Sequence, residues 1–186
     1  MVFYLFFVLI VFQRLIELVI AKRNERFMKE KGALEFGKGH YPLIFIIHSL
    51  FFVSFLFEVV YYKQELSPLW LCFLFLFLLT QVGRIWALLS LGVYWNTKIL
   101  VLPNAPTIKK GPYRILKHPN YLIVSLEFLI IPVLFQAYIT ATIFSVLNAI
   151  ILAIRIPTEE KALKTWMNDE QAYRIASSSE KDVEKV

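Results

Sequence analysis

Apolar side chains fill long stretches of this 186-residue chain, and short polar segments separate them. A helix that crosses a bilayer needs about 20 mainly apolar residues, so each long stretch predicts a transmembrane helix. The last apolar stretch is interrupted near Gln136 and Ala137, which predicts a tight hairpin of two short helices. We therefore expect an all-α, polytopic membrane protein with five spans. The predicted spans are 2–20, 42–62, 68–91, 121–136 and 138–154.

Basic residues gather in three of the segments that border these spans, namely 21–41, 92–120 and the tail after 154. In contrast, the loop 63–67 has only Lys63, and the hairpin turn has no charge. Loops rich in Lys and Arg stay in the cytoplasm, so we expect the N-terminus outside and the C-terminus inside the cell membrane. The net charge of +6 then reflects membrane orientation, and we expect no nucleic-acid partner.

The two ends of the chain differ in character. The first span does not resemble a cleaved signal peptide, because it lacks a basic start and contains Arg14 and Glu17. The tail predicts a cytoplasmic helix that begins at Pro157, since proline suits the first turn of a helix. Residues 177–186 are polar and predict disorder. We therefore expect one membrane domain over 1–176, followed by a disordered tail.

Several polar residues lie within the apolar stretches, where charges are costly unless they are paired. Arg14 and Glu17 are three positions apart and can pair on one side of a helix. His48 reads as a hydrogen-bonded packing residue, and Glu58 lies where it can reach water. Arg84 either extends to the interface or meets an acidic ligand. The single cysteine, Cys72, allows no disulfide and no cysteine-rich metal site, and we expect no metal.

A denser group of reactive side chains borders the predicted hairpin. It comprises His-Pro-Asn-Tyr at 118–121, Glu127 inside the fourth span, and the segment 155–163, which reads RIPTEEKAL. The predicted topology brings all three to the cytoplasmic membrane face. Glu127 is either a structural ion-pair partner or a functional carboxylate, and Glu159 and Glu160 also suit the start of a helix.

The same residues resemble a known family. GPYRILKHPNYLIV at 111–124, followed by RIPTEEKAL, is similar to the isoprenylcysteine carboxyl methyltransferase family, over about 84–173 of the chain. The N-terminal half resembles the bacterial branch of that family. KTWMNDEQAY at 164–173 departs from the family pattern and displaces Tyr173. The matching positions are Gly111, Pro112, Tyr113, Arg114, His118, Pro119, Tyr121, Arg155, Glu159, Glu160 and Leu163.

The resemblance implies an integral membrane O-methyltransferase that uses S-adenosyl-L-methionine and takes a lipophilic acceptor from the bilayer. The acceptor would carry an acidic oxygen, as in an alkylpyrone- or alkylresorcinol-like polyketide or a prenyl carboxylate. With six glycines, the chain has no Gly-rich loop after a strand, which the soluble methyltransferase fold uses for this cofactor. The implied cofactor-binding residues are Tyr113, His118, Pro119, Tyr121, Glu159 and Glu160.

The implied chemistry gives few residues a direct role. Arg155 would hold the oxygen anion, and Arg84 would join it in binding the acceptor. Glu127 would orient His118 or offset the cation.

Two alternatives remain open from the sequence. A membrane lipid reductase that uses NADPH would have a similar C-terminal hairpin, and competition between S-adenosylhomocysteine and NADPH would separate it from a methyltransferase. A non-enzymatic transporter is the second alternative. Transporters often contain inverted repeats and broken helices in both halves, whereas this chain shows no repeat and carries its motif in one half.

Overall fold

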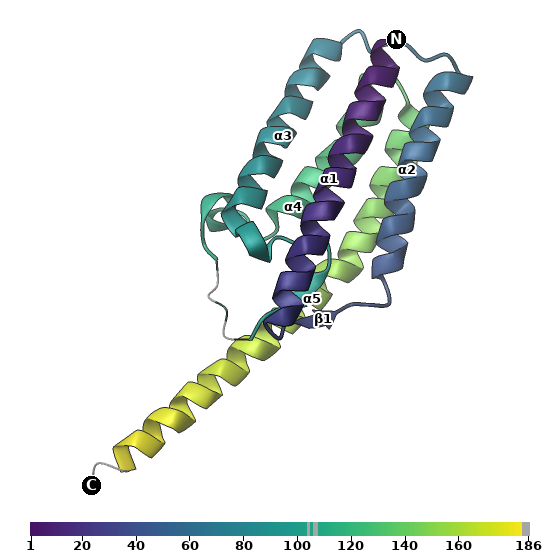
Figure 1. Ribbon diagram of the computed structural model, residues 1–186. Helices are drawn as coiled ribbons and strands as arrows, with labels where there is room; N and C mark the ends of the chain where they lie inside the picture. Colours follow the sequence, from purple (N-terminus) through teal and green to yellow (C-terminus); the bar gives the residue numbers. More distant parts are fainter. Residues whose placement is uncertain (104, 106–107, 184–186) are drawn as a thin grey trace.

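Five long helices form one bundle, in agreement with the predicted all-α membrane protein (Figure 1). The structure is a computed structural model that describes residues 1–103, 105 and 108–183, with the backbone alone for 166–183. The turn between the last two helices falls at residues 135–137, where the sequence predicts it. The helices are α1 (Val2–Glu30), α2 (Tyr41–Tyr61), α3 (Trp70–Leu91), α4 (Pro119–Leu134) and α5 (Tyr138–Val183).

Four of these helices are long and apolar enough to cross a bilayer, and α4 is the exception. With 16 residues, α4 is about 24 Å long, which is less than the ~30 Å of a hydrocarbon core. The sequence predicts two short arms for the hairpin, and α4 agrees with that prediction, whereas α5 does not. Helix α5 has 46 residues and continues beyond the bundle (Figure 1).

Helix α5 runs through Pro157 without a break, so the prediction of a separate helix starting there is wrong. Proline removes one amide donor from the helix ladder, and nearby hydroxyls can satisfy carbonyls around such a site. The Thr158 hydroxyl donates to the Ile154 carbonyl oxygen at 2.8 Å. The helix assignment extends to Val183, within the predicted disordered segment 177–186. Residues 184–186 lie outside the described residues.

A small antiparallel ribbon, which the sequence does not predict, closes one end of the bundle. Its strands are β1 (Leu34–Phe36) and β2 (Ile99–Val101), with Glu35 opposite Leu100. Ile99 and Val101 pack with Ala162 of α5. The described parts of the three basic regions all lie at this end, which we call the ribbon end (Figure 1).

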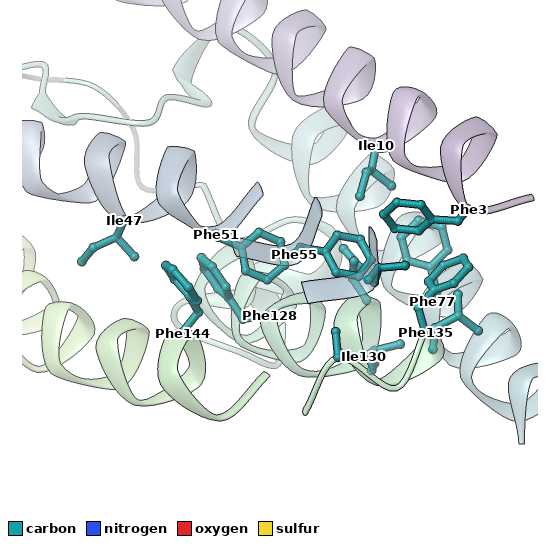
Figure 2. Close-up of a cluster of buried hydrophobic side chains, with 14 of the residues drawn as sticks. Phe3, Ile10, Ile47, Phe51, Phe55, Phe77, Phe128, Ile130, Phe135 and Phe144 are labelled. Carbon is teal, nitrogen blue, oxygen red and sulfur yellow. The ribbon is translucent and has the colours of Figure 1, made fainter. Parts of the chain in front are cut away.

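Aromatic side chains fill the other half of the bundle (Figure 2). Phe55 of α2 is fully buried between Phe3 of α1 and Phe135 at the hairpin turn, with ring centres 5.3 and 6.0 Å away. Phe51 meets Phe128 edge to face at 4.7 Å. Edge-to-face pairs of this kind are favourable beyond their buried area, so this cluster joins α1 and α2 to the α4–α5 hairpin.

Glu58 has a structural position that the sequence analysis does not foresee. Its side chain is 5% exposed, so the expectation that it reaches water is wrong. Its carboxylate accepts hydrogen bonds from the backbone N–H groups of Ile139 and Thr140 at 3.0 and 2.7 Å. A carboxylate stabilises the positive end of a helix, and Glu58 therefore caps the start of α5.

Candidate functional site

A cavity of about 290 Å³ lies between α1, α2, α4 and α5. Leu15 of α1 and Phe45 of α2 line the cavity and are also exposed on the bundle surface. The cavity therefore reaches the lateral surface of the bundle between α1 and α2. Its apolar wall consists of Val11, Leu15, Leu18, Ile44, Phe45, Phe52, Val124, Ile151 and Leu152.

Arg155 stands at the polar end of this cavity, together with Tyr121 and Thr97. Its Nε donates to the Tyr121 hydroxyl at 2.8 Å, its Nη2 donates to the Thr97 carbonyl oxygen, and its guanidinium lies 5.4 Å from the centre of the Tyr121 ring. Among the described residues, no carboxylate forms an ion pair with Arg155, although the residue is 8% exposed. Burial, and then the Arg155 charge, lower the pKa of nearby His40.

The side chains predicted to bind the cofactor come together beside Arg155. The His118 and Tyr121 rings stack with centres 5.2 Å apart. His118 Nε2 lies 3.3 Å from a Glu160 oxygen and His118 Nδ1 lies 3.7 Å from a Glu159 oxygen. The Tyr121 hydroxyl donates to Glu159, and Lys117 pairs with Glu160 at 2.6 Å. Two helices thus present two carboxylates and an aromatic face at one place.

The local sequence explains how this cluster is held. Pro119 occupies the first turn of α4, where the missing N–H costs nothing. Gly111 has φ +53°, and a Cβ there would collide with Ser90 and Trp86 of α3. The short helix η2 (Gly111–Arg114) can therefore pack against α3 only with glycine at its start. Burial raises the pKa of the Tyr113 phenol, so its hydroxyl stays neutral and accepts a hydrogen bond from Asn120 at 2.9 Å.

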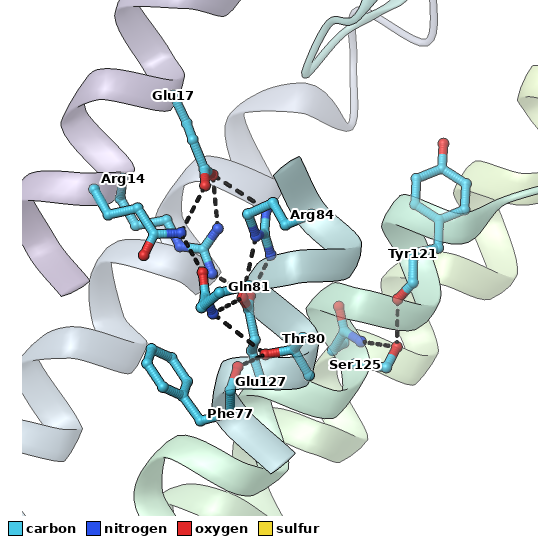
Figure 3. A network of polar contacts seen from close by, with 11 residues as sticks. Arg14, Glu17, Phe77, Thr80, Gln81, Arg84, Tyr121, Ser125 and Glu127 are labelled. Atoms are coloured by element: carbon cyan, nitrogen blue, oxygen red, sulfur yellow. Dashed lines mark hydrogen bonds and ion pairs between the residues drawn. The ribbon is translucent and has the colours of Figure 1, made fainter. Parts of the chain in front are cut away.

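Four charged side chains from three helices form a second network between α1, α3 and α4 (Figure 3). Arg14 pairs with Glu17 at 2.7 Å, as the sequence predicts, and it also pairs with Glu127. Arg84 bonds Glu17 through Nη1 at 3.1 Å and Glu127 through Nε at 3.1 Å. Gln81 donates to Glu127 at 2.8 Å. The two arginines and two glutamates balance each other in charge.

This network bears on the roles that the sequence analysis gives to Glu127 and Arg84. Glu127 is 2% exposed and bonds Arg14, Arg84 and Gln81, and among the described residues it has no hydrogen bond to His118. The geometry therefore favours the ion-pair interpretation of Glu127. Arg84 lines the cavity, but all three of its nitrogens already bond carboxylates. Arg155 is thus better placed than Arg84 to receive an external anion.

Sequence reasoning missed the residues that link α3 to β2, which also border the cavity. Trp95, Asn96 and Thr97 all line it. Asn24 of α1 donates to the Trp95 carbonyl oxygen at 2.8 Å and so anchors this link. The polar run Asn96–Lys98, which interrupts the apolar residues on either side, was the available signal. Tyr173 lies among the residues whose side chains are outside the described part of the chain.

The fold and this site define a class: a multi-pass α-helical membrane protein whose polar, motif-bearing site adjoins an apolar cavity. The chain belongs to the isoprenylcysteine carboxyl methyltransferase (ICMT) family, a family of integral membrane methyltransferases whose model matches residues 71–165. The match includes the whole α4–α5 motif region and leaves out α1 and α2.

Two bacterial relatives extend the similarity. The uncharacterized protein YpbQ of Bacillus subtilis (strain 168) is 48% identical over 164 residues, which cover 88% of this chain and 98% of the relative. An uncharacterized protein of Haemophilus influenzae is 28% identical over 151 residues, with coverage of 81% and 88%. No solved structure matches the chain.

Proposed function

We propose that this protein transfers a methyl group from S-adenosyl-L-methionine to an acidic oxygen of a lipophilic small molecule at the cytoplasmic membrane face. The observation that carries this proposal is Arg155, a buried cation without a carboxylate partner among the described residues, at the polar end of an apolar cavity. An anionic oxygen of the acceptor balances that charge, and the walls of the cavity accommodate its hydrocarbon tail.

The chemistry of the neighbouring side chains fits the cofactor. Glu159 and Glu160 can accept hydrogen bonds from ribose hydroxyls or pair with the amino group, and the stacked His118 and Tyr121 offer an aromatic face. Pro119 and Tyr113 shape the base of this cluster. When bound, the cofactor supplies a methyl group that is already activated by its positive sulfur.

The protein's own task is positioning. An acidic enol or carboxylate is largely anionic near neutral pH, so no strong general base is required. Arg155 stabilises the anion and is itself held by Tyr121 and the Thr97 carbonyl. Fixing both reactants in an attack geometry can supply much of the rate enhancement.

The membrane delivers the acceptor to the cavity. The opening between α1 and α2 faces the lateral surface of the bundle, so an alkyl or prenyl tail enters from lipid and the cofactor enters from water at the ribbon end. Burying one methylene of the tail contributes about 0.8 kcal/mol of favourable free energy when the group leaves water, but far less when it leaves lipid. The bilayer therefore concentrates and orients the acceptor more than it tightens the contact.

Binding of S-adenosylhomocysteine to the purified protein in detergent tests the cofactor assignment. Glu160→Gln and His118→Ala should abolish binding, measured by calorimetry, while Lys161→Gln, one position along the same helix, should bind like the parent. Parent-like binding by both site variants would show that the pocket is elsewhere. Displacement by NADPH would favour the reductase alternative.

The acceptor assignment needs a second experiment in vesicles. Methyl transfer should increase with the length of the acceptor's alkyl chain and stop when its acidic oxygen is replaced by hydrogen. Equal activity on a short, water-soluble acid would contradict entry from the membrane.

A further inference from the structure

The segment 109–117, which leads into α4, exposes only basic and aliphatic side chains. Ile115 is 81% exposed, and its neighbour Leu116 is also exposed. Segments that lie in a membrane interface combine these two kinds of residue, because the apolar side chains enter the lipid while the cations stay among the head groups. The exposed basic residues are Lys109, Lys110, Arg114 and Lys117.

The length of α4 places this segment at the depth of the lipid head groups. The helix begins at Pro119 and is about 24 Å long, whereas the hydrocarbon core of a bilayer is about 30 Å thick. With the hairpin turn at one membrane interface, the start of α4 does not extend past the other. The residues directly before Pro119 therefore lie at the interface and not in bulk water.

Trp86 of α3 indicates the same depth independently. Gly111 lies so close to α3 that a Cβ there would be 2.8 Å from the Trp86 indole nitrogen. Trp86 is exposed, and tryptophans of membrane helices are enriched at the two interfaces. Trp70, which is also exposed, lies sixteen positions earlier on α3, or about 24 Å along the helix. The two tryptophans therefore enclose a length that matches α4.

The protein itself does not balance the charge of this segment. The sequence contains no Asp or Glu between positions 66 and 126. Within the described part of the chain, only Lys117 of the four basic residues has an ion-pair partner, which is Glu160 at 2.6 Å. Each of the other three cations should strengthen the attraction to an anionic membrane surface about fivefold.

We propose that the segment 109–117 is an anchor that binds anionic phospholipids of the leaflet at the ribbon end. An anionic phospholipid suits both kinds of side chain, because its phosphate attracts the cations and its acyl chains accommodate Ile115 and Leu116. His118 follows the anchor directly, so the anchor also holds the His118 cluster at head-group depth. The inference does not depend on the proposed methyl transfer.

A nitroxide label at position 115 tests the depth. Ile115→Cys, combined with Cys72→Ser, is labelled in vesicles of phosphatidylcholine and phosphatidylglycerol. The label should be more accessible to oxygen than to a water-soluble nickel chelate, as should a label at Leu129→Cys on the exposed face of α4. Lys161→Cys, an exposed position of α5 at the ribbon end, gives the aqueous reference. A label at position 115 that behaves like this reference would overturn the inference.

The affinity for phosphatidylglycerol, measured by native mass spectrometry in detergent, tests the charge. The parent should bind this lipid more tightly than phosphatidylcholine. Lys110→Gln/Arg114→Gln should weaken the binding of phosphatidylglycerol about 25-fold and leave the affinity for phosphatidylcholine unchanged.

Lys63→Gln is the matched control, because it removes an exposed lysine from the loop at the opposite end of the bundle, and it should bind both lipids like the parent. Three results would contradict the anchor: equal affinity of the parent for the two lipids, an equal loss in Lys63→Gln, or equally tight binding of soluble glycerol phosphate.

Discussion

The charge balance between Arg14, Arg84, Glu17 and Glu127 leads to a quantitative prediction for Glu127→Gln. This variant keeps the shape of the side chain but leaves two arginines with one carboxylate, and therefore one uncompensated positive charge inside the bundle. Breaking a buried ion pair by removing one partner costs about 3–5 kcal/mol, and an arginine at the centre of a membrane helix costs about 2.5–3.5 kcal/mol. The free energy of unfolding of Glu127→Gln should therefore be about 3 kcal/mol lower than that of the parent.

Thermal unfolding in detergent measures this loss. For a chain of this size, 1 kcal/mol corresponds to about 2–4 °C in Tm, so Glu127→Gln should lower Tm by about 6–12 °C. Glu30→Gln, which removes an exposed carboxylate at the ribbon end, should change Tm by less than about 2 °C. The double variant Arg84→Met/Glu127→Leu keeps Arg14 and Glu17 as a neutral pair, and it should unfold closer to the parent than Glu127→Gln does.

Two results would refute this reasoning. A Tm of Glu127→Gln within about 2 °C of the parent would mean that the network does not depend on charge compensation. A stable Glu127→Gln protein that binds S-adenosylhomocysteine but no longer transfers a methyl group would assign Glu127 a direct part in the reaction. The present geometry favours the structural role.

Three further predictions concern other parts of the molecule. Glu58→Gln weakens the cap of α5 and should lower stability by about 1 kcal/mol, seen as a lower Tm; an unchanged Tm would show that the cap is dispensable. The hydrogen bond from Lys29 lowers the pKa of Glu35, so this carboxylate stabilises the fold above its ordinary pKa, and the contribution is lost as pH falls through the lowered value. The Tm difference between the parent and Glu35→Gln should therefore be present at pH 7 and disappear in acid, and a difference that persists in acid would contradict the pairing. Lys109→Cys, with Cys72 replaced, should react with an impermeant thiol reagent only after cells are permeabilised; labelling of intact cells would reverse the proposed orientation.

Much of the helical architecture could be predicted from local patterns. The length of each apolar stretch indicated the spans because a helix in lipid must satisfy its own backbone hydrogen bonds over the membrane thickness. The Arg14–Glu17 pair was predictable because residues three apart lie on one side of a helix. The segments 111–121 and 155–160 indicated a cluster of reactive side chains because they flank one short hairpin, and the structure brings His118, Tyr121, Glu159 and Glu160 together.

The predictions that failed were those that depended on neighbours distant in the sequence. Pro157 was expected to begin a helix, yet α5 continues through it. Glu58 was expected to reach water, but its carboxylate accepts a hydrogen bond from the backbone N–H of Ile139, which lies 81 residues further along the chain at the start of α5. The ribbon was missed because strands of three residues carry almost no pattern of their own and are stabilised by packing against Ala162.

The amino-acid sequence by itself determined that this chain forms a helical membrane bundle. A segment that crosses the bilayer must be apolar over the membrane thickness and must satisfy its own backbone hydrogen bonds, and both requirements depend on the segment's own sequence. It also identified the residues of the family motif. Only the tertiary structure decided which charges are paired and which have no carboxylate partner among the described residues. Glu127 meets an arginine 113 residues away, Arg155 meets none of the described carboxylates, and Trp95 and Asn120 come to one cavity from separate segments. Such pairings depend on how the helices pack, since charge compensation acts through distances in space and not through positions along the chain.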